Sequence, residues 1–302
     1  MTLPPLIDTH HHLWDLENNR YPWLQEGIDH FVGDYTPIRK TYLITDFLQG
    51  AEGLPLRKSV HVQAEWDHNA DPVGETAWLQ KVADSPGSRG MPNAIIGYAN
   101  LADPQVEDVL ARHAAHPNWR GIRLMLNWSD ENPRLRFAES GGLMRDSQWR
   151  KGYRLLAKYG GSFDMQVWPW QLADGAKLAK DIPEVPVILN HTGMPKDWDR
   201  QGVEQWRKGM RAIASAPNIA VKISALGMMK QDWTVADLRP FVLDTIEIIG
   251  ADRCMFASNF PVDSLFSDYA TLWNAYDEIT SDFTESERAM LFHDNAERYY
   301  RI

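Results

Sequence analysis

The chain has little of several features that would assign it to a specialised class of protein. It contains one cysteine, Cys254, in 302 residues, which excludes an internal disulfide and is typical of a reducing compartment such as the cytoplasm. No apolar run is long enough to cross a bilayer, and the N-terminus lacks the basic and apolar regions of a secretory signal. The formal net charge is -10 without any basic cluster, which argues against nucleic acid or an anionic membrane as a partner. We therefore expect a small-molecule substrate, and the sequence leaves the oligomeric state open.

What the chain does contain is a regular alternation of β-rich and helical segments. The β-rich segments are residues 6–10, 59–64, 94–100, 121–126, 162–167, 185–190, 219–224 and 254–258. Helical patterns lie between most of them, at residues 72–84, 104–116, 147–158, 203–216 and 235–249. Such alternation indicates parallel βαβ units, and eight units are typical of a (β/α)8 TIM barrel of about 250 residues or more. A doubly wound open sheet is the main alternative, but no glycine-rich phosphate loop follows the first strand. With no break in composition, we predict one domain over residues 1–302.

Polar residues recur at alternate positions of the predicted strands. In the fourth strand Arg123 and Asn127 lie on the face opposite Ile122, Leu124 and Leu126. The same phase groups His61 with Gln63 and Glu65, Tyr98 with Asn100, Asp164 with Gln166 and Trp168, and Lys222 with Ser224. Polar side chains inside a barrel are costly unless they bind something, so this pattern predicts a ligand site. A solvated, half-buried sheet would show the same alternation.

Histidines stand where two predicted strands end. His10 and His12 are two residues apart on the first strand and therefore share a face, and His191 follows the sixth strand. Three neutral imidazoles with an open water position are typical of catalytic zinc, which lowers the pKa of bound water towards ~7. His10, His12 and His191 are therefore candidate ligands of a divalent metal, zinc or manganese. The alternative is a chance cluster of core or strand-end histidines.

Two cations are candidates for binding charge on a substrate. The guanidinium of Arg123 is suited to clamp a carboxylate or to stabilise an oxyanion, and Lys222 to bind an anion or polarise a carbonyl. An ion pair inside the barrel with Glu65 or Asp164 is the structural alternative for Arg123.

Long segments without helical periodicity follow three strands, at residues 15–45, 127–146 and 194–201. In a barrel enzyme such loops build the catalytic face, so we expect a deep, partly covered pocket. Several of the 13 tryptophans follow strands, and aromatic faces at a pocket mouth favour a cyclic substrate. The predicted substrate-binding residues are Trp14, Gln63, Glu65, Trp66, Asn127, Trp128, Gln166 and Trp168. The alternative for each tryptophan is that it packs a loop onto the barrel.

An ordered set of short motifs spans nearly the whole chain. They are Asp8-Thr9-His10-x-His12-x-Trp14, Val62-Gln63-Ala64, Gly121-Ile122-Arg123, His191-Thr192-Gly193 and Ser258-Asn259-Phe260-Pro261. With these motifs the chain resembles the amidohydrolase superfamily, specifically the amidohydrolase-2 group of sugar-lactone and dicarboxylate-lactone hydrolases. The resemblance implies a TIM barrel with His10, His12 and His191 at the metal or catalytic centre. Because lactonases of this group differ in their need for metal, it leaves metal occupancy open.

The chain departs from the family pattern on the eighth strand. The superfamily usually has an aspartate there that binds metal or takes a proton from water, whereas this chain has Asn259. An amide is no general base and is a weak metal ligand. Asp263 is a substitute carboxylate, or alternatively the cap of the following helix, and we favour the cap.

Together these features predict a hydrolase that opens a lactone of a sugar acid or related carboxylated ring. The alternatives are a metal-dependent decarboxylase of an aromatic acid and a catalytically silent barrel that binds a ligand.

Overall fold

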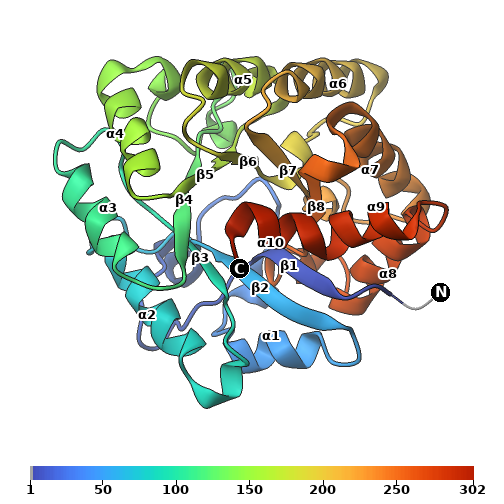
Figure 1. Cartoon of the computed structure of the whole chain (residues 1–302), viewed down its shortest axis with the longest axis horizontal. Coiled ribbons are helices and arrows are strands. Elements are labelled where there is room, and N and C mark those ends of the chain that lie inside the picture. The colour runs from blue at the N-terminus through green and yellow to red at the C-terminus, as the bar shows by residue number, and fades with distance from the viewer. Residues whose placement is uncertain (1–2) are drawn as a thin grey trace.

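Eight parallel strands run in chain order around a nearly closed barrel in the computed structural model, which describes residues 3–302 (Figure 1). The strands are β1 (Leu6–His11), β2 (Leu56–Val62), β3 (Ala94–Gly97), β4 (Trp119–Met125), β5 (Ser162–Gln166), β6 (Val187–Leu189), β7 (Ile219–Ile223) and β8 (Cys254–Phe256). Each strand pairs with the next one in parallel. The predicted TIM barrel is confirmed.

Most of the helices form a ring around the strands (Figure 1). They are α1 (Ile44–Gly50), α2 (Val73–Ala83), α3 (Val106–Ala114), α4 (Ser147–Lys158), α5 (Leu172–Asp181), α6 (Arg200–Ala214), α7 (Val235–Ile249), α8 (Tyr269–Ile279), α9 (Glu285–Ala289) and α10 (Asn295–Tyr300). Side-chain caps set several helix starts: Asp146 accepts from Trp149 N at 2.7 Å before α4, and Thr234 begins α7 with a capping box. No helix within residues 3–302 has the length and apolar character needed to cross a membrane.

The seam between the first and last strands is closed just beyond β8. The backbone N–H of Asn259 donates to His10 O at 2.7 Å, and His12 N donates to Phe260 O at 2.7 Å. The buried carboxylate of Asp8 accepts from both the backbone N and the Oγ of Ser258, at 2.9 and 2.5 Å. The seam therefore places Asn259 beside the two histidines of β1.

An apolar cluster fills part of the barrel interior. Val60 and Val62 of β2 pack there against Ile188 and Met255, with further residues from β3 and β7. His61 lies on the opposite face of β2, where its Nε2 accepts from Leu13 N at 2.9 Å. The inward orientation predicted for His61 is therefore wrong, because β2 uses the other phase of its alternation to fill the barrel.

The C-terminal helix α10 lies across one end of the barrel (Figure 1). Its Tyr300 is fully buried and belongs to the same interior cluster as Val60 and Met255. The Tyr300 hydroxyl donates to Asp164 Oδ1 at 3.0 Å. The side chain thus closes the end of the barrel away from the long loops and reaches a charged group inside it.

Candidate functional site

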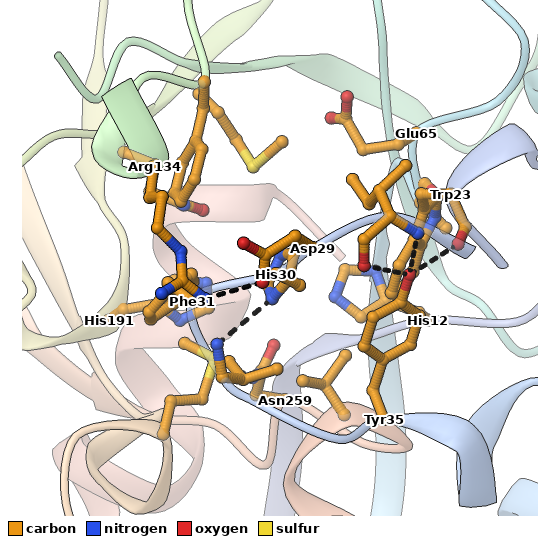
Figure 2. A pocket seen from close by; sticks show the side chains of 18 of the residues that line it. His12, Trp23, Asp29, His30, Phe31, Tyr35, Glu65, Arg134, His191 and Asn259 are labelled. Carbon is orange, nitrogen blue, oxygen red and sulfur yellow. Dashed lines mark hydrogen bonds and ion pairs between the residues drawn. The ribbon is translucent and has the colours of Figure 1, made fainter. Parts of the chain in front are cut away.

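A cavity of about 350 Å³ lies where the carboxyl ends of the strands meet the long loops (Figure 2). We call its polar lining the floor, which consists of His12, Glu65, Arg123, Gln166, His191 and Asn259. We call its aromatic lining the roof, which consists of Trp23, His30, Phe31, Tyr35 and Phe137. Floor residues lie on or directly after strands, whereas roof residues come from segments 15–45 and 127–146, as a covered barrel pocket requires.

The three predicted histidines lie together. The ring centroid of His10 is 4.9 Å from that of His12 and 4.5 Å from that of His191. His12 Nδ1 lies 2.7 Å from the carbonyl oxygen of Val62, and only a protonated nitrogen makes that bond. In its neutral form His12 therefore carries its lone pair on Nε2, and its ring lines the cavity.

His191 enters the floor through an unusual backbone. His191 and Thr192 both have φ of 58°, in the left-handed region, and such conformations persist where the surroundings enforce them. Two bonds to β7 do so here: His191 Nδ1 lies 3.0 Å from Ser224 Oγ, and Thr192 Oγ1 donates to Ser224 O at 3.1 Å. The turn after β6 is thereby held against β7 with the imidazole in the cavity.

All three histidines are neutral near pH 7. Burial lowers the pKa of His10, His12 and His191 well below its usual value. Arg123 acts in the same direction on all three, and Lys222 on His10 and His191. A neutral imidazole has a lone pair that can accept a proton from water, and the lowered pKa makes it a weaker base than an exposed histidine.

Arg123 is buried in the floor. Its two predicted roles, binding a substrate carboxylate and stabilising an oxyanion, both stay predictions. Its Nη2 donates to Gln63 O at 2.6 Å and its Nη1 to Gln166 Oε1 at 3.0 Å, which fixes the plane of the guanidinium. Glu65 Oε1 lies 3.6 Å from Nη2, so the predicted ion pair with Glu65 is present, and φ of 60° turns Glu65 towards the cavity. Nε has no hydrogen-bond partner among the described residues.

Lys222 lies deeper in the barrel, below the cavity. Its Nζ is 2.6 Å from Asp164 Oδ1, with both side chains fully buried, and 3.5 Å from His10 Nδ1. Tyr300 completes the group, with its ring 5.2 Å from Nζ. Burial lowers the pKa of Lys222 and raises that of Asp164, while the ion pair opposes both shifts. Asp164 is the other carboxylate predicted as a partner of Arg123, and it pairs with Lys222 instead. The Lys222 ammonium also lies next to the His10 ring.

The metal site predicted at His10, His12 and His191 stays a prediction. Within residues 3–302, no three His, Cys, Asp or Glu side chains are grouped to hold one ion. His10 Nε2 is buried and has no partner among those residues, but the fourth family position is the amide of Asn259. The mechanism below therefore uses the protein's own groups.

Asn259 and Asp263 follow β8 and occupy different places. Asn259 lines the cavity and has φ of 59°, which asparagine tolerates. Asp263 is buried outside the cavity lining, and burial raises its pKa to about 8, opposed by a hydrogen bond with Asn259. The helix-cap prediction for Asp263 is wrong, because Asp268 caps α8 by accepting from Thr271 N at 2.8 Å.

The predicted substrate-binding residues divide between the cavity and its support. Glu65 and Gln166 line the cavity. The remaining predictions, Trp14, Gln63, Trp66, Asn127, Trp128 and Trp168, are outside its lining as the structure describes it. Trp168 instead backs the roof, with its ring 5.6 Å from Phe31 and 5.7 Å from Phe137. Sequence reasoning missed the roof itself, whose residues have no periodic spacing; the only signal was the length of the two loops.

Comparison with known proteins gives the family. The amidohydrolase family model matches residues 7–302. The chain belongs to the amidohydrolase family. As a member it is a hydrolase with a TIM-barrel fold.

Relatives match nearly the full length of this chain. The uncharacterized protein y4mH of Sinorhizobium fredii is 48% identical over 298 residues, which cover 98% of each chain. An L-fucono-1,5-lactonase of Burkholderia multivorans is 27% identical, over 98% of this chain and 96% of that enzyme. The crystal structure of an amidohydrolase from Burkholderia multivorans with bound HEPES has a TM-score of 0.81 and 23% identity, over 98% of this chain and 99% of that one. A second crystal form of it contains bound zinc. At that identity the likeness shows the fold alone.

Proposed function

We propose that this amidohydrolase hydrolyses a lactone, the cyclic ester of a sugar acid or of a related carboxylated ring. The observation that carries the proposal is the pairing of a neutral His12, whose Nδ1 is held by Val62 O and whose ring lines the cavity beside Asn259, with a buried, oriented Arg123. A general base and a fixed cation are what ester hydrolysis by water requires. The similarity to L-fucono-1,5-lactonase over nearly the full chain supports the same reaction type.

The floor provides a group for each step of the reaction. His12 Nε2 takes a proton from a water molecule as its oxygen attacks the lactone carbonyl carbon. The carbonyl oxygen gains the negative charge, which the Arg123 guanidinium stabilises. The tetrahedral intermediate then expels the ring oxygen, which takes the proton back from His12. The product is the open-chain hydroxy acid, and it carries every atom of the lactone and the water.

The departure at Asn259 is compatible with this route. Because the proton goes to an imidazole, no carboxylate is needed as the base on β8. Ring opening also needs less help for the leaving group than amide hydrolysis does. Zinc or manganese binding, a small-molecule partner and a cytoplasmic location stay predictions, and metal analysis of the purified protein tests the first of them.

Product analysis tests the proposal. The purified protein is mixed with six-membered lactones of sugar acids and with a carboxylated pyrone, in weak buffer containing a pH indicator. We expect acid release above the spontaneous rate, with one hydroxy acid formed per lactone consumed. Carbon dioxide released from aromatic acids, without acid release from lactones, would instead identify a decarboxylase. Ligand binding with neither reaction would identify a silent barrel.

A further inference from the structure

The roof is a continuous aromatic surface built around His30. The His30 ring lies 4.9 Å from Phe31, 5.7 Å from Tyr35 and 6.0 Å from Trp23. It also lies parallel to Phe137, within 8° at 6.1 Å, so the ring joins two loops that are far apart in the sequence. Figure 2 shows Trp23, His30, Phe31 and Tyr35 around the cavity, with Trp23 close to Glu65.

Nearly every polar atom of the roof is already bonded within the protein. Trp23 Nε1 donates to Ala64 O at 2.9 Å. The Tyr35 hydroxyl lies 2.9 Å from Trp23 O and 3.0 Å from Ile28 O as a donor, and it accepts from Ile28 N at 2.6 Å. His30 Nδ1 accepts from Val32 N at 3.3 Å, and burial lowers the pKa of His30 to about 4, which leaves the ring neutral. The ring proton is then on His30 Nε2, which has no hydrogen bond to the described residues, so towards a ligand the roof offers this one N–H and is otherwise an apolar surface.

The charged side chains at the cavity rim also make contacts within the protein. Arg134 forms an ion pair with Asp29 at 2.6 Å. Arg136 donates to Ser129 O at 2.7 Å and to Asp130 O at 2.6 Å. The first contact joins the two loops, whereas the other two lie within residues 127–146. The buried polar side chains of the cavity lining lie on the floor.

This division between floor and roof restricts the substrate. A hydroxyl group buried against the roof away from His30 Nε2 would lose its water without gaining a partner, which lowers affinity by about one to two orders of magnitude. A methylene group buried there gains about three- to fourfold. Both effects favour a ligand that places alkyl groups, and not hydroxyl groups, against the roof.

We infer that the substrate is an amphipathic lactone, with its carbonyl and ring oxygen on the floor and a hydrocarbon or aromatic substituent against the roof. The inference rests on the proposed lactone hydrolysis. Among sugar-acid lactones it favours those that carry a deoxy or alkyl group at this position over fully hydroxylated ones.

A series of lactones with one ring size tests this inference. The wild-type protein is assayed with δ-valerolactone, with its 5-methyl and 5-propyl derivatives, and with a fully hydroxylated hexono-1,5-lactone. We expect kcat/KM to rise about three- to fourfold per added carbon and to be lowest for the hydroxylated lactone. Phe137→Gln places an amide in the roof. In this variant kcat/KM should rise less per added carbon, because KM should fall less along the alkyl series. The matched control is Trp170→Gln, at a tryptophan that is 38% exposed and outside the cavity lining, and it should keep the wild-type series.

The outcomes separate the inference from the function on which it rests. Hydrolysis of all the lactones with no rise along the alkyl series, or with preference for the hydroxylated one, overturns the amphipathic substrate and leaves lactone hydrolysis standing. Failure to hydrolyse any lactone overturns the proposed function. In that case calorimetry with the matching alkyl δ-lactams still tests the roof, since the same rise per carbon in affinity is expected, and its absence refutes the inference.

Discussion

The floor and the roof of the cavity are built by different means. Floor residues such as Arg123 and His191 are fixed by strands and by hydrogen bonds to neighbouring strands. Roof residues such as His30 and Phe137 lie on two loops and are held by ring contacts, and the ion pair that also joins these loops is exposed. The difference teaches that the barrel determines which reaction is available, whereas the loops determine which molecule reaches it.

The most severe test of the floor is to remove its base. We expect His12→Asn to lower kcat/KM on a lactone by about 10²–10⁴, because it removes the Nε2 lone pair that accepts the proton. Steady-state kinetics measure the loss, and circular dichroism checks that the variant is folded. The control is His293→Asn, at a histidine paired with Asp294 away from the cavity. A His12 variant with a wild-type rate would show that another group takes the proton.

The second test concerns the support beneath the floor. Lys222→Met should lower the free energy of unfolding by about 3–5 kcal/mol, because it leaves the Asp164 carboxylate buried without its partner. Urea denaturation measures the change. The matched control is Lys177→Met, which breaks a largely exposed pair with Asp181 and should cost less than about 1 kcal/mol. Equal losses in both variants would refute a special role for the buried pair.

A third, smaller effect should appear in the pH dependence of stability. The pKa of Asp263 is raised from 3.8 to about 8 in the folded protein. The unfolded chain therefore releases this proton near pH 4 and the native protein only near pH 8, so stability is lost as the pH rises between these values. Asp263→Asn should remove that part of the slope. Thermal or urea unfolding at pH 5, 6.5 and 8 measures it, and parallel curves for variant and wild type would contradict the assignment.

The smallest effect is expected at the rim of the roof. Arg134→Met breaks the ion pair with Asp29, in which the side chains are 63% and 70% exposed. Exposed pairs contribute about 0–1 kcal/mol, so both the melting temperature and KM should change little. A large rise in KM would show that the loops depend on this pair to cover the cavity, and the contrast between floor and roof would then need revision.

Much of the barrel and part of the floor could be predicted from sequence, because alternation and strand order are local properties. The alternation of polar and apolar residues predicted that Arg123, Gln166 and Lys222 face the barrel interior, and the structure places them there. It failed for His61, since hydrophobic alternation alone does not say which face of β2 fills the barrel. Tyr300 and the roof had no local signal, because their places depend on contacts between residues more than 100 positions apart.

The seam between β1 and β8 has one more consequence. The bonds that close the ring, from Asn259 N to His10 O and from His12 N to Phe260 O, join residues of the floor itself. An open, partly folded barrel therefore lacks the arrangement that catalysis requires. Enzymatic turnover consequently reports completion of the ring, and in a refolding experiment it should recover only with the last structural phase, after most helical signal has returned.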